Sequence, residues 1–231
     1  MPDTVTVRGE ERPLKLRMHA RARRMILRFD PRTGYGRLTV PPGTAPSAAR
    51  AFLSQSARWI DDNAPPLANP DTPFVATLPI AGVPHTLVPT GKTRGLVRIG
   101  EGGKLFVPGA PDRIMPRLAA FLKTEAERVL TPQVLDISAQ LGSRPAAIRY
   151  RDPRSQWGSC SSKRIITLSW RVMMAPPEAQ AYLVAHEVAH LRHMDHSRRF
   201  WATVAALEPE WKHGQRALKR VEKDLLSIAF S

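Results

Sequence analysis

The sequence predicts an α+β fold with two parts, a β-rich module with one helix over residues 1–110 and a helix-rich domain over residues 111–231. Two observations carry this prediction. Before residue 110, short runs rich in β-branched and aromatic residues alternate with turn-forming Gly, Pro and Asp. Beyond Pro111, the apolar residues change from a period near two to a period near 3.6, which favours helices.

The N-terminal strands are predicted from the runs MILRF and GRLTV, which flank a turn at residues 30–36. We expect them to form an antiparallel sheet. An Ala-rich amphipathic stretch over residues 47–63 predicts a helix packed on this sheet. The proline-rich residues 65–73 indicate a linker, and the runs TLPIAGVPHTLVP and LVRIGEGGKLFVP indicate two further strand pairs.

The second part begins with a predicted helix over residues 114–141, with Pro132 as the place for a kink. The runs IRYRD, QWGSC and RIITLSW then predict three strands of a small antiparallel sheet. Two prolines at 176 and 177 mark the start of the next helix, since proline is favoured in a first helical turn. A pair of helices follows from Ser197.

The composition of the chain indicates its cellular compartment and the kinds of partner that it could bind. The net charge of +15 favours acidic or phosphate-rich partners, although the basic residues are spread along the chain. Cys160 is the only cysteine, so no intrachain disulfide can form and a reducing compartment is expected. No secretory signal or membrane span is apparent, because the longest uncharged stretch is broken by four prolines. We therefore expect a cytoplasmic protein with no membrane partner.

The residues best suited to bind a metal ion and act as a base lie in the segment HEVAH, residues 186–190. His186 and His190 are four residues apart on a predicted helix, so both imidazoles face one side and can bind one metal ion. Glu187 next to the first histidine can reach a water molecule at that ion and act as a general base. The flanking residues are apolar, and three buried ionisable side chains would be costly without a metal. Two histidines satisfied within an ordinary helix are the alternative.

A catalytic zinc ion usually takes three protein ligands, so a third donor is expected. His196 is the first candidate. On an unbroken helix it would lie about 15 Å along the axis from His186, so the helix must stop first. Residues 194–197 provide that stop, because Ser197 is a good N-cap for a new helix. The other candidates are His193, which shares the helical face of His186, and a carboxylate from the group Glu208, Glu210 and Glu222.

The block RSQWGSCSSKRIITLSWRVMMAPPEAQAYLVAHEVAHLRHMDHSRRFW, residues 154–201, resembles the signature of the YgjP-like metal-dependent hydrolases and, more distantly, of the SprT-like zinc proteases. RARRMILRFDPRTGYGRLTVPPGT and AFLSQSARWI resemble the amino-terminal module of the same family, so the likeness covers most of the chain. One departure is Gln156, where family members commonly have arginine before WGSC.

This resemblance implies a zincin-like catalytic domain. It implies that zinc is held by His186, His190 and His196, the last within an HSxxFW block, and that Glu187 is the catalytic acid/base. It also places the Trp157-Gly158-Ser159 segment near the active site, as substrate-binding residues on a strand that borders the cleft. Peptide hydrolysis is the activity implied by fold and motif, and nucleotide phosphohydrolysis has also been attached to the family.

Several other features have a structural and a functional interpretation. Cys160 is interpreted as a buried small residue rather than a ligand or nucleophile. Trp157, Trp170 and Trp201 fit the core better than a substrate groove. The densest basic cluster can contact nucleic-acid phosphates or form a solvated sheet face, and we treat nucleic-acid contact as secondary. It comprises Arg21, Arg23, Arg24 and Arg28.

Together these patterns predict a zinc metallopeptidase that cleaves peptide or protein substrates. A metal-dependent nucleotide phosphohydrolase is the rival enzyme; the basic charge favours it, and the absence of an aspartate cluster for magnesium argues against it. A basic nucleic-acid-associated protein with a purely structural zinc is the third hypothesis, and it requires a fourth protein ligand.

Overall fold

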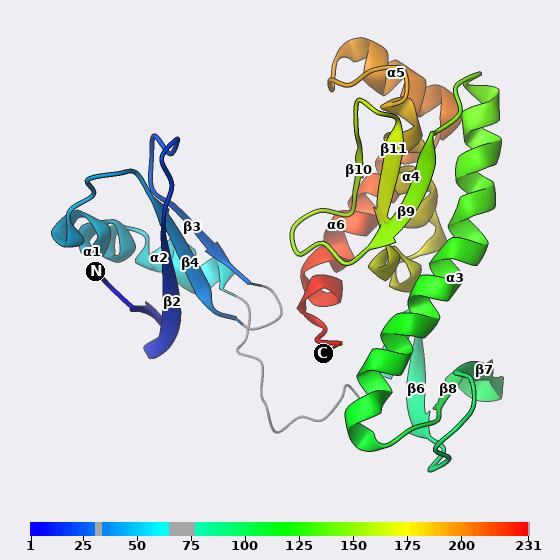
Figure 1. Ribbon diagram of the computed structural model, residues 1–231, viewed down its shortest axis with the longest axis horizontal. Coiled ribbons are helices and arrows are strands. Elements are labelled where there is room, and N and C mark those ends of the chain that lie inside the picture. The colour runs from blue at the N-terminus through cyan, green and yellow to red at the C-terminus, as the bar shows by residue number, and fades with distance from the viewer. Residues whose placement is uncertain (31–33, 65–76, 231) are drawn as a thin grey trace. The chain divides into compact units, whose positions relative to one another are not determined.

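The computed structural model of the chain describes residues 1–30, 34–64 and 77–230 (Figure 1). The described residues form two compact units, one of residues 1–64 with 227–229 and one of residues 77–226 with 230. The expected linker over residues 65–73 lies outside the described residues. The expected α+β class is confirmed, because sheets and helices occur in both units.

The smaller unit is a four-stranded sheet with two helices. Its strands run in the spatial order β1-β2-β4-β3. The elements are β1 (Thr4–Val7), β2 (Glu10–Met18), β3 (Ile26–Phe29), β4 (Gly36–Val40), α1 (Pro46–Gln55) and α2 (Ala57–Asn63). The expectation of a purely antiparallel sheet is wrong here, since β2 and β4 are parallel. The β3–β4 hairpin places β3 at the edge, so that β4 returns beside β2 in the same direction as β2.

One face of this sheet forms the core of the smaller unit. Alternate residues of the strands are buried, and they pack with helical residues such as Ala49 and Ile60. Trp59 of α2 stacks on Phe29 of β3 with ring centroids 6.5 Å apart. The single helix expected over residues 47–63 is divided at Ser56, whose backbone N–H closes the last turn of α1. Both helices therefore cover the same face, and the other face of the sheet is left to charged side chains.

The larger unit begins with a second four-stranded sheet of order β5-β6-β8-β7. Its strands are β5 (Thr77–Ile80), β6 (Val83–Pro89), β7 (Arg98–Gly100) and β8 (Lys104–Val107), with a 3-10 turn η1 at Glu101–Gly103. The turn between β5 and β6 donates backbone hydrogen bonds from Ala81 to Met173 and from Gly82 to Met174. These bonds tie the sheet to the C-terminal part, so the compact units divide earlier than the domain boundary expected at residue 110. The boundary at residue 110 remains a prediction about this chain.

The rest of the larger unit is built along one long helix. Its elements are α3 (Pro111–Gln140), β9 (Ala147–Arg151), β10 (Gly158–Cys160), β11 (Ile165–Ser169), a 3-10 turn η2 (Trp170–Met174), α4 (Pro177–Ala189), α5 (Arg198–Leu207) and α6 (Trp211–Ser227). Helix α3 continues through Pro132 and buries residues spaced four apart, such as Leu118, Leu122, Ala126 and Leu130. It runs the length of this unit, from β8 to β9 (Figure 1).

The small sheet of this unit has the order β10-β11-β9. Strand β11 is antiparallel to β10 and parallel to β9, so the sheet is mixed, and the expectation of antiparallel pairing throughout is wrong. The chain crosses from β9 to the far edge before the β10–β11 hairpin brings it back to the centre, which makes β11 run in the same direction as β9. Strand β10 is consequently an edge strand of the sheet. Among the described residues, no helix is both long and apolar enough to cross a bilayer.

Candidate metal centre and active site

Helix α4 presents two histidines at its C-terminal end. The helix begins with Pro177 in its first turn and ends at Ala189, with His190 as its C-cap. His186 and His190 are one turn apart, and their ring centroids are separated by 5.0 Å. Nine residues of α4 are buried, including Val184, Val188 and the ionisable Glu187, and so is the C-cap His190.

The chain turns after α4 and returns a third histidine to the same place. The stop expected at residues 194–197 comes earlier, at Ala189, and the next helix begins at Arg198 with Ser197 as its N-cap. The Ser197 hydroxyl accepts a hydrogen bond from the Phe200 N–H at 3.4 Å. This turn brings the His196 Nε2 atom to 3.3 Å from the His186 Nε2 atom. One potential ligand atom from each of His186, His190 and His196 lies within 4.8 Å of the others.

Phe200 supports all three imidazoles. Its ring centroid lies 5.0 Å from that of His186, 4.5 Å from that of His190 and 4.8 Å from that of His196. The Phe200 side chain is fully buried with Ala189 and Val204 between α4 and α5. The apolar residue that fixes the angle between the two helices therefore also fixes the positions of the three rings.

The second nitrogens of two of the rings are held by hydrogen bonds. The His190 Nδ1–H group donates to the His193 carbonyl oxygen at 2.9 Å, which leaves Nε2 as the unprotonated atom. The His186 Nδ1 atom lies 3.4 Å from the Tyr182 hydroxyl, and that hydroxyl accepts a hydrogen bond from the Gln215 side-chain amide at 3.2 Å. These partners orient the rings with Nε2 towards the cluster, as outer partners of metal-binding histidines do.

The electrostatics of the cluster favour neutral imidazoles. Burial, together with the smaller effects of the neighbouring His190 and His196, lowers the pKa of His186 to about 4. Burial also lowers the pKa of His190 below its ordinary value. Because the neutral imidazole is the form that binds metal ions, the rings of His186 and His190 are available as ligands at neutral pH.

Glu187 lies behind strand β10 and close to the histidines. Its side chain is almost fully buried, and burial raises the pKa of this carboxyl to about 8. Gly158 of β10 leaves the space for it: a Cβ atom at residue 158 would lie 2.5 Å from the Glu187 Oε1 atom. The Oε2 atom is buried and has no hydrogen-bond partner within the described part of the chain. A buried, unsatisfied carboxylate is expensive, so this atom needs a partner that the protein chain does not supply.

The residues of the cluster fit a metal ion. Three imidazole nitrogens form the donor set that zinc takes in many catalytic sites. The Nε2 atoms of His186 and His196 lie 3.3 Å apart, so without an ion one ring must donate a proton to the other, whereas a cation near both could accept a lone pair from each. A cation with a water molecule beside it would satisfy these nitrogens and the buried Glu187 oxygen together.

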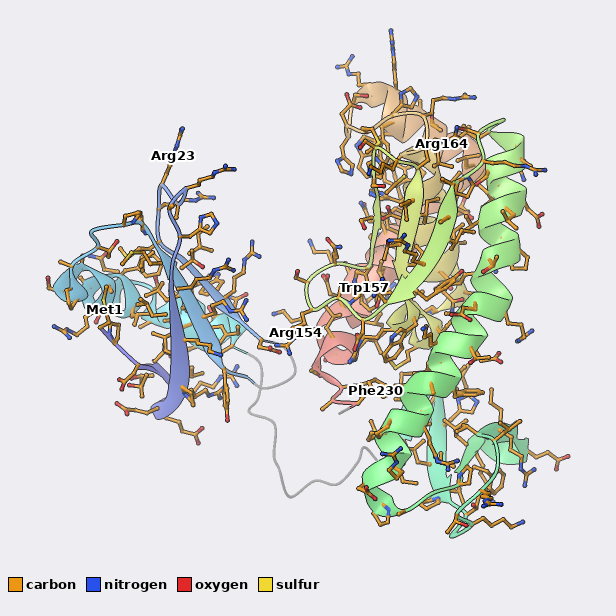
Figure 2. All side chains as sticks on the ribbon, viewed as in Figure 1. Met1, Arg23, Arg154, Trp157, Arg164 and Phe230 are labelled. Atoms are coloured by element: carbon orange, nitrogen blue, oxygen red, sulfur yellow. The ribbon has the colours of Figure 1, made fainter. Side chains whose placement is uncertain are left out.

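The structure separates the other candidates from this centre. Glu208 caps the C-terminal end of α5, and His193 contributes its carbonyl oxygen rather than its ring to the hydrogen bonds of the site. Trp157, which is labelled in Figure 2, donates from Nε1 to Glu222 on α6 at 3.2 Å. Neither His193 nor any of the three glutamates lies in the metal-binding group found among the described residues.

The expected substrate-binding segment has three different environments. Trp157 is buried against α6, and Gly158 lies against Glu187. Ser159 is paired with Thr167 of the neighbouring strand β11. Of the three residues, Gly158 is therefore the one that the structure brings next to the candidate catalytic carboxylate.

Sequence reasoning did not assign the roles of Tyr182 and Gln215. Tyr182 lies four residues before His186, on the same face of α4, so helical spacing alone could have indicated a contact between the two side chains. Gln215 lies on α6, and nothing local in the sequence links it to α4. Its contact with the Tyr182 hydroxyl depends on the packing of the two helices.

Comparisons with known proteins identify a family for this chain. A family described as "YgjP-like, metallopeptidase domain" matches residues 23–221. Among solved structures, the chain is similar to the metallopeptidase zymogen abylysin of Pyrococcus abyssi, with 26% identity over 39% of this chain and 94% of that chain, and a TM-score of 0.35. No curated protein matches the chain.

Proposed function

The chain belongs to the YgjP-like family of metallopeptidase domains, and on that premise we propose that it is a zinc-dependent peptidase of the HExxH type. The observation that carries this proposal is the group of three imidazoles beside a buried glutamate. Peptides or unfolded proteins are the proposed substrates. A cytoplasmic location is part of the proposal, because the lone Cys160 suits a reducing compartment.

His186, His190 and His196 would hold the ion through their Nε2 atoms. When bound, zinc would polarise the scissile carbonyl group and lower the pKa of a water molecule at the site. Phe200 and the hydrogen bonds to the Nδ1 atoms keep the three rings in place before the ion arrives. Little reorganisation is then required on binding.

Glu187 would move the proton in this reaction. Its carboxylate would take a proton from the attacking water and pass it to the nitrogen of the leaving amine. A pKa raised to about 8 by burial brings the carboxylate close to the basicity that is most effective near neutral pH. Glu187 is not a member of the metal-binding group, so it is free to act as base rather than ligand.

Strand β10 supports a peptide as the substrate. Ser169 N–H donates to the Trp157 carbonyl, and Ser161 N–H donates to the Ile165 carbonyl. Since hydrogen-bonded pairs alternate along an antiparallel ladder, the backbone groups of Gly158 and Cys160 point away from β11 and towards the open edge. An extended peptide can pair with such an edge, and here it would pass beside Glu187.

The test compares metal content and proteolysis in matched variants. We expect about one zinc per native chain by elemental analysis, with loss of the metal in His186→Ala and in His196→Ala. His213→Ala is the control, because this exposed histidine lies outside the cluster and pairs with Glu178. Glu187→Gln should retain zinc and lose cleavage of fluorescently labelled casein. Cleavage that persists in Glu187→Gln would rule out the assigned base.

The same variants separate the rival activities. Phosphate release from nucleoside triphosphates that is lost in Glu187→Gln, without any casein cleavage, would indicate a phosphohydrolase instead. The donor set argues against this result, since the group contains no carboxylate of the kind that magnesium prefers. A zinc ion that is bound but supports neither activity would indicate a structural role.

A further inference from the structure

The face of the small sheet that α1 and α2 leave uncovered carries a row of three cations. Register places Arg37 of β4 directly opposite Lys15 of β2 on one side and Arg28 of β3 on the other. All three side chains are exposed, and alternation along the strands puts them on the face opposite the core residue Leu38. Directly opposite side chains have Cβ atoms about 5 Å apart, so the three charges are close neighbours.

This row costs stability in the isolated unit. Like charges directly opposite each other in a sheet are destabilising. In the described part of the chain, no ion pair is found for Lys15, Arg28 or Arg37. Two acidic residues lie on this face near the row. Glu11 of β2 is opposite Thr6 of β1, and Asp30, two residues after Arg28, is opposite Tyr35. Solvation alone does not explain three adjacent positive charges, whereas a bound polyanion would neutralise them.

The cationic surface extends beyond the row. Arg17 is the next outward-facing residue of β2, opposite Thr39. The loop from β2 to β3 then adds three exposed arginines at the same end of the sheet, and Figure 2 shows Arg23 projecting from it. We call this surface the basic face; its members are Lys15, Arg17, Arg21, Arg23, Arg24, Arg28 and Arg37.

An exposed aromatic ring borders the row on the other side. Asp30 N–H donates to the Tyr35 carbonyl at 2.9 Å, which continues the β3–β4 ladder by one pair. Alternation therefore puts Tyr35 on the same face as Arg37, two residues along the strand. The Tyr35 side chain is 48% exposed. Cations that follow a phosphate backbone and an aromatic ring on which a base can stack are the two elements of single-strand recognition on a sheet.

We propose that the basic face of the small sheet binds single-stranded nucleic acid, with phosphates on the Lys15–Arg37–Arg28 row and a base stacked on Tyr35. A duplex fits this face less well, since its bases are already stacked and its major groove is read by an inserted helix or ribbon rather than by a sheet face. This surface lies in a different unit from the metal centre and does not depend on the proposed peptidase activity.

The experiment measures binding of the full chain to a fluorescently labelled deoxythymidine oligonucleotide of about 20 nucleotides by anisotropy. Arg28→Glu with Arg37→Glu should weaken binding by at least about tenfold, because two phosphate contacts become repulsive. The matched control is Arg50→Glu with Arg58→Glu, which makes the same change of charge at exposed helical positions of the same unit. We expect the control to change the dissociation constant by less than about twofold.

Two further arms test the nature of the ligand. Tyr35→Ala should weaken binding to the single strand by about tenfold and leave heparin binding unchanged. The slope of log affinity against log salt should be about −2 for three phosphate contacts and should become shallower in Lys15→Gln, which removes one charge without reversal. If the variant with both Arg28→Glu and Arg37→Glu does not fold, Lys15→Gln still tests the contribution of the row to binding.

Three results would overturn the proposal. Equal weakening by both double variants would show a response to net charge alone. Tighter binding to duplex or heparin, with no effect of Tyr35→Ala, would indicate a general polyanion surface. Binding to vesicles of anionic phospholipid without binding to the oligonucleotide would indicate a membrane surface instead. Casein cleavage should be the same in all the variants of the basic face.

Discussion

Gly158 and Glu187 occupy one space between β10 and α4, since a Cβ atom at residue 158 would lie 2.5 Å from the Glu187 Oε1 atom and 2.7 Å from its Cδ atom. The carboxylate keeps its position because the strand has no side chain there. The missing side chain on β10 therefore leaves room for Glu187 of α4, the residue to which we assign the proton transfer.

Gly158→Ala should therefore reduce turnover without removing the metal. The added methyl group displaces the Glu187 carboxylate, and loss of a positioned general base costs about 10²-fold or more in kcat. Casein cleavage and zinc content, measured on the same preparation, check this. The shorter carboxylate of Glu187→Asp should recover part of the activity when combined with Gly158→Ala. Full activity in Gly158→Ala alone would show that the position of Glu187 does not limit the reaction.

Tyr182→Phe should weaken zinc binding. The change removes the hydroxyl group that lies between His186 Nδ1 and Gln215, and loss of such an outer partner costs about 10- to 100-fold in metal affinity. Competition with a chromogenic chelator measures the effect. Tyr150→Phe is the control, because that hydroxyl is also partly buried but bonds to Thr131, outside the site. Equal affinities in the two variants would contradict an orienting role for Tyr182.

Cys160 should react slowly with iodoacetamide. Burial, with a contribution from Glu187, raises the pKa of this thiol from 9.0 to about 11. A raised pKa reduces the fraction of reactive thiolate, so alkylation near pH 7 should be about 100-fold slower than for an unperturbed thiol. The rate should continue to rise with pH up to about 11 and should increase at neutral pH when urea unfolds the chain. A rate that levels off near pH 9 would show an ordinary thiol.

Asp152→Ala should destabilise the larger unit. Arg171 is fully buried and donates to the Asp152 carboxylate at 2.6 Å and to the Leu225 carbonyl at 2.9 Å. Removing the Asp152 carboxylate takes a close acceptor away from a fully buried guanidinium, with a cost of about 3 kcal/mol in the free energy of unfolding. Urea denaturation measures this. Glu125→Ala breaks the exposed pair with Arg128 and should leave the midpoint unchanged.

Local patterns in the sequence were sufficient for much of the fold. The 3.6-residue period of Leu118, Leu122 and Leu130 predicted α3, and Ser197 predicted the start of α5. The spacing of His186 and His190 predicted a shared helical face, and the structure has both rings in one cluster. These features depend on residues within a few turns of each other, which is why one sequence is informative about them.

Contacts between distant segments were not predictable in this way. The parallel pairing of β2 with β4 depends on which strand takes the edge of the sheet, and the composition of the strands does not determine this. The contact of Gln215 with Tyr182, and that of Trp157 with Glu222, join α6 to residues more than 30 positions away. The cation row on the small sheet likewise became apparent only from the strand register.

The position of His190 at the end of α4 has a mechanical consequence. Two of the three proposed ligands lie on or at the end of one helix, and the third precedes the next helix, so an ion would close a loop between residues 190 and 196. An ion that binds both ends of that loop would stabilise the closed arrangement against local opening. Amide hydrogen exchange should then slow in α5 on zinc addition more than in α3. The ion would then hold α4 and α5 together in addition to its role in the reaction.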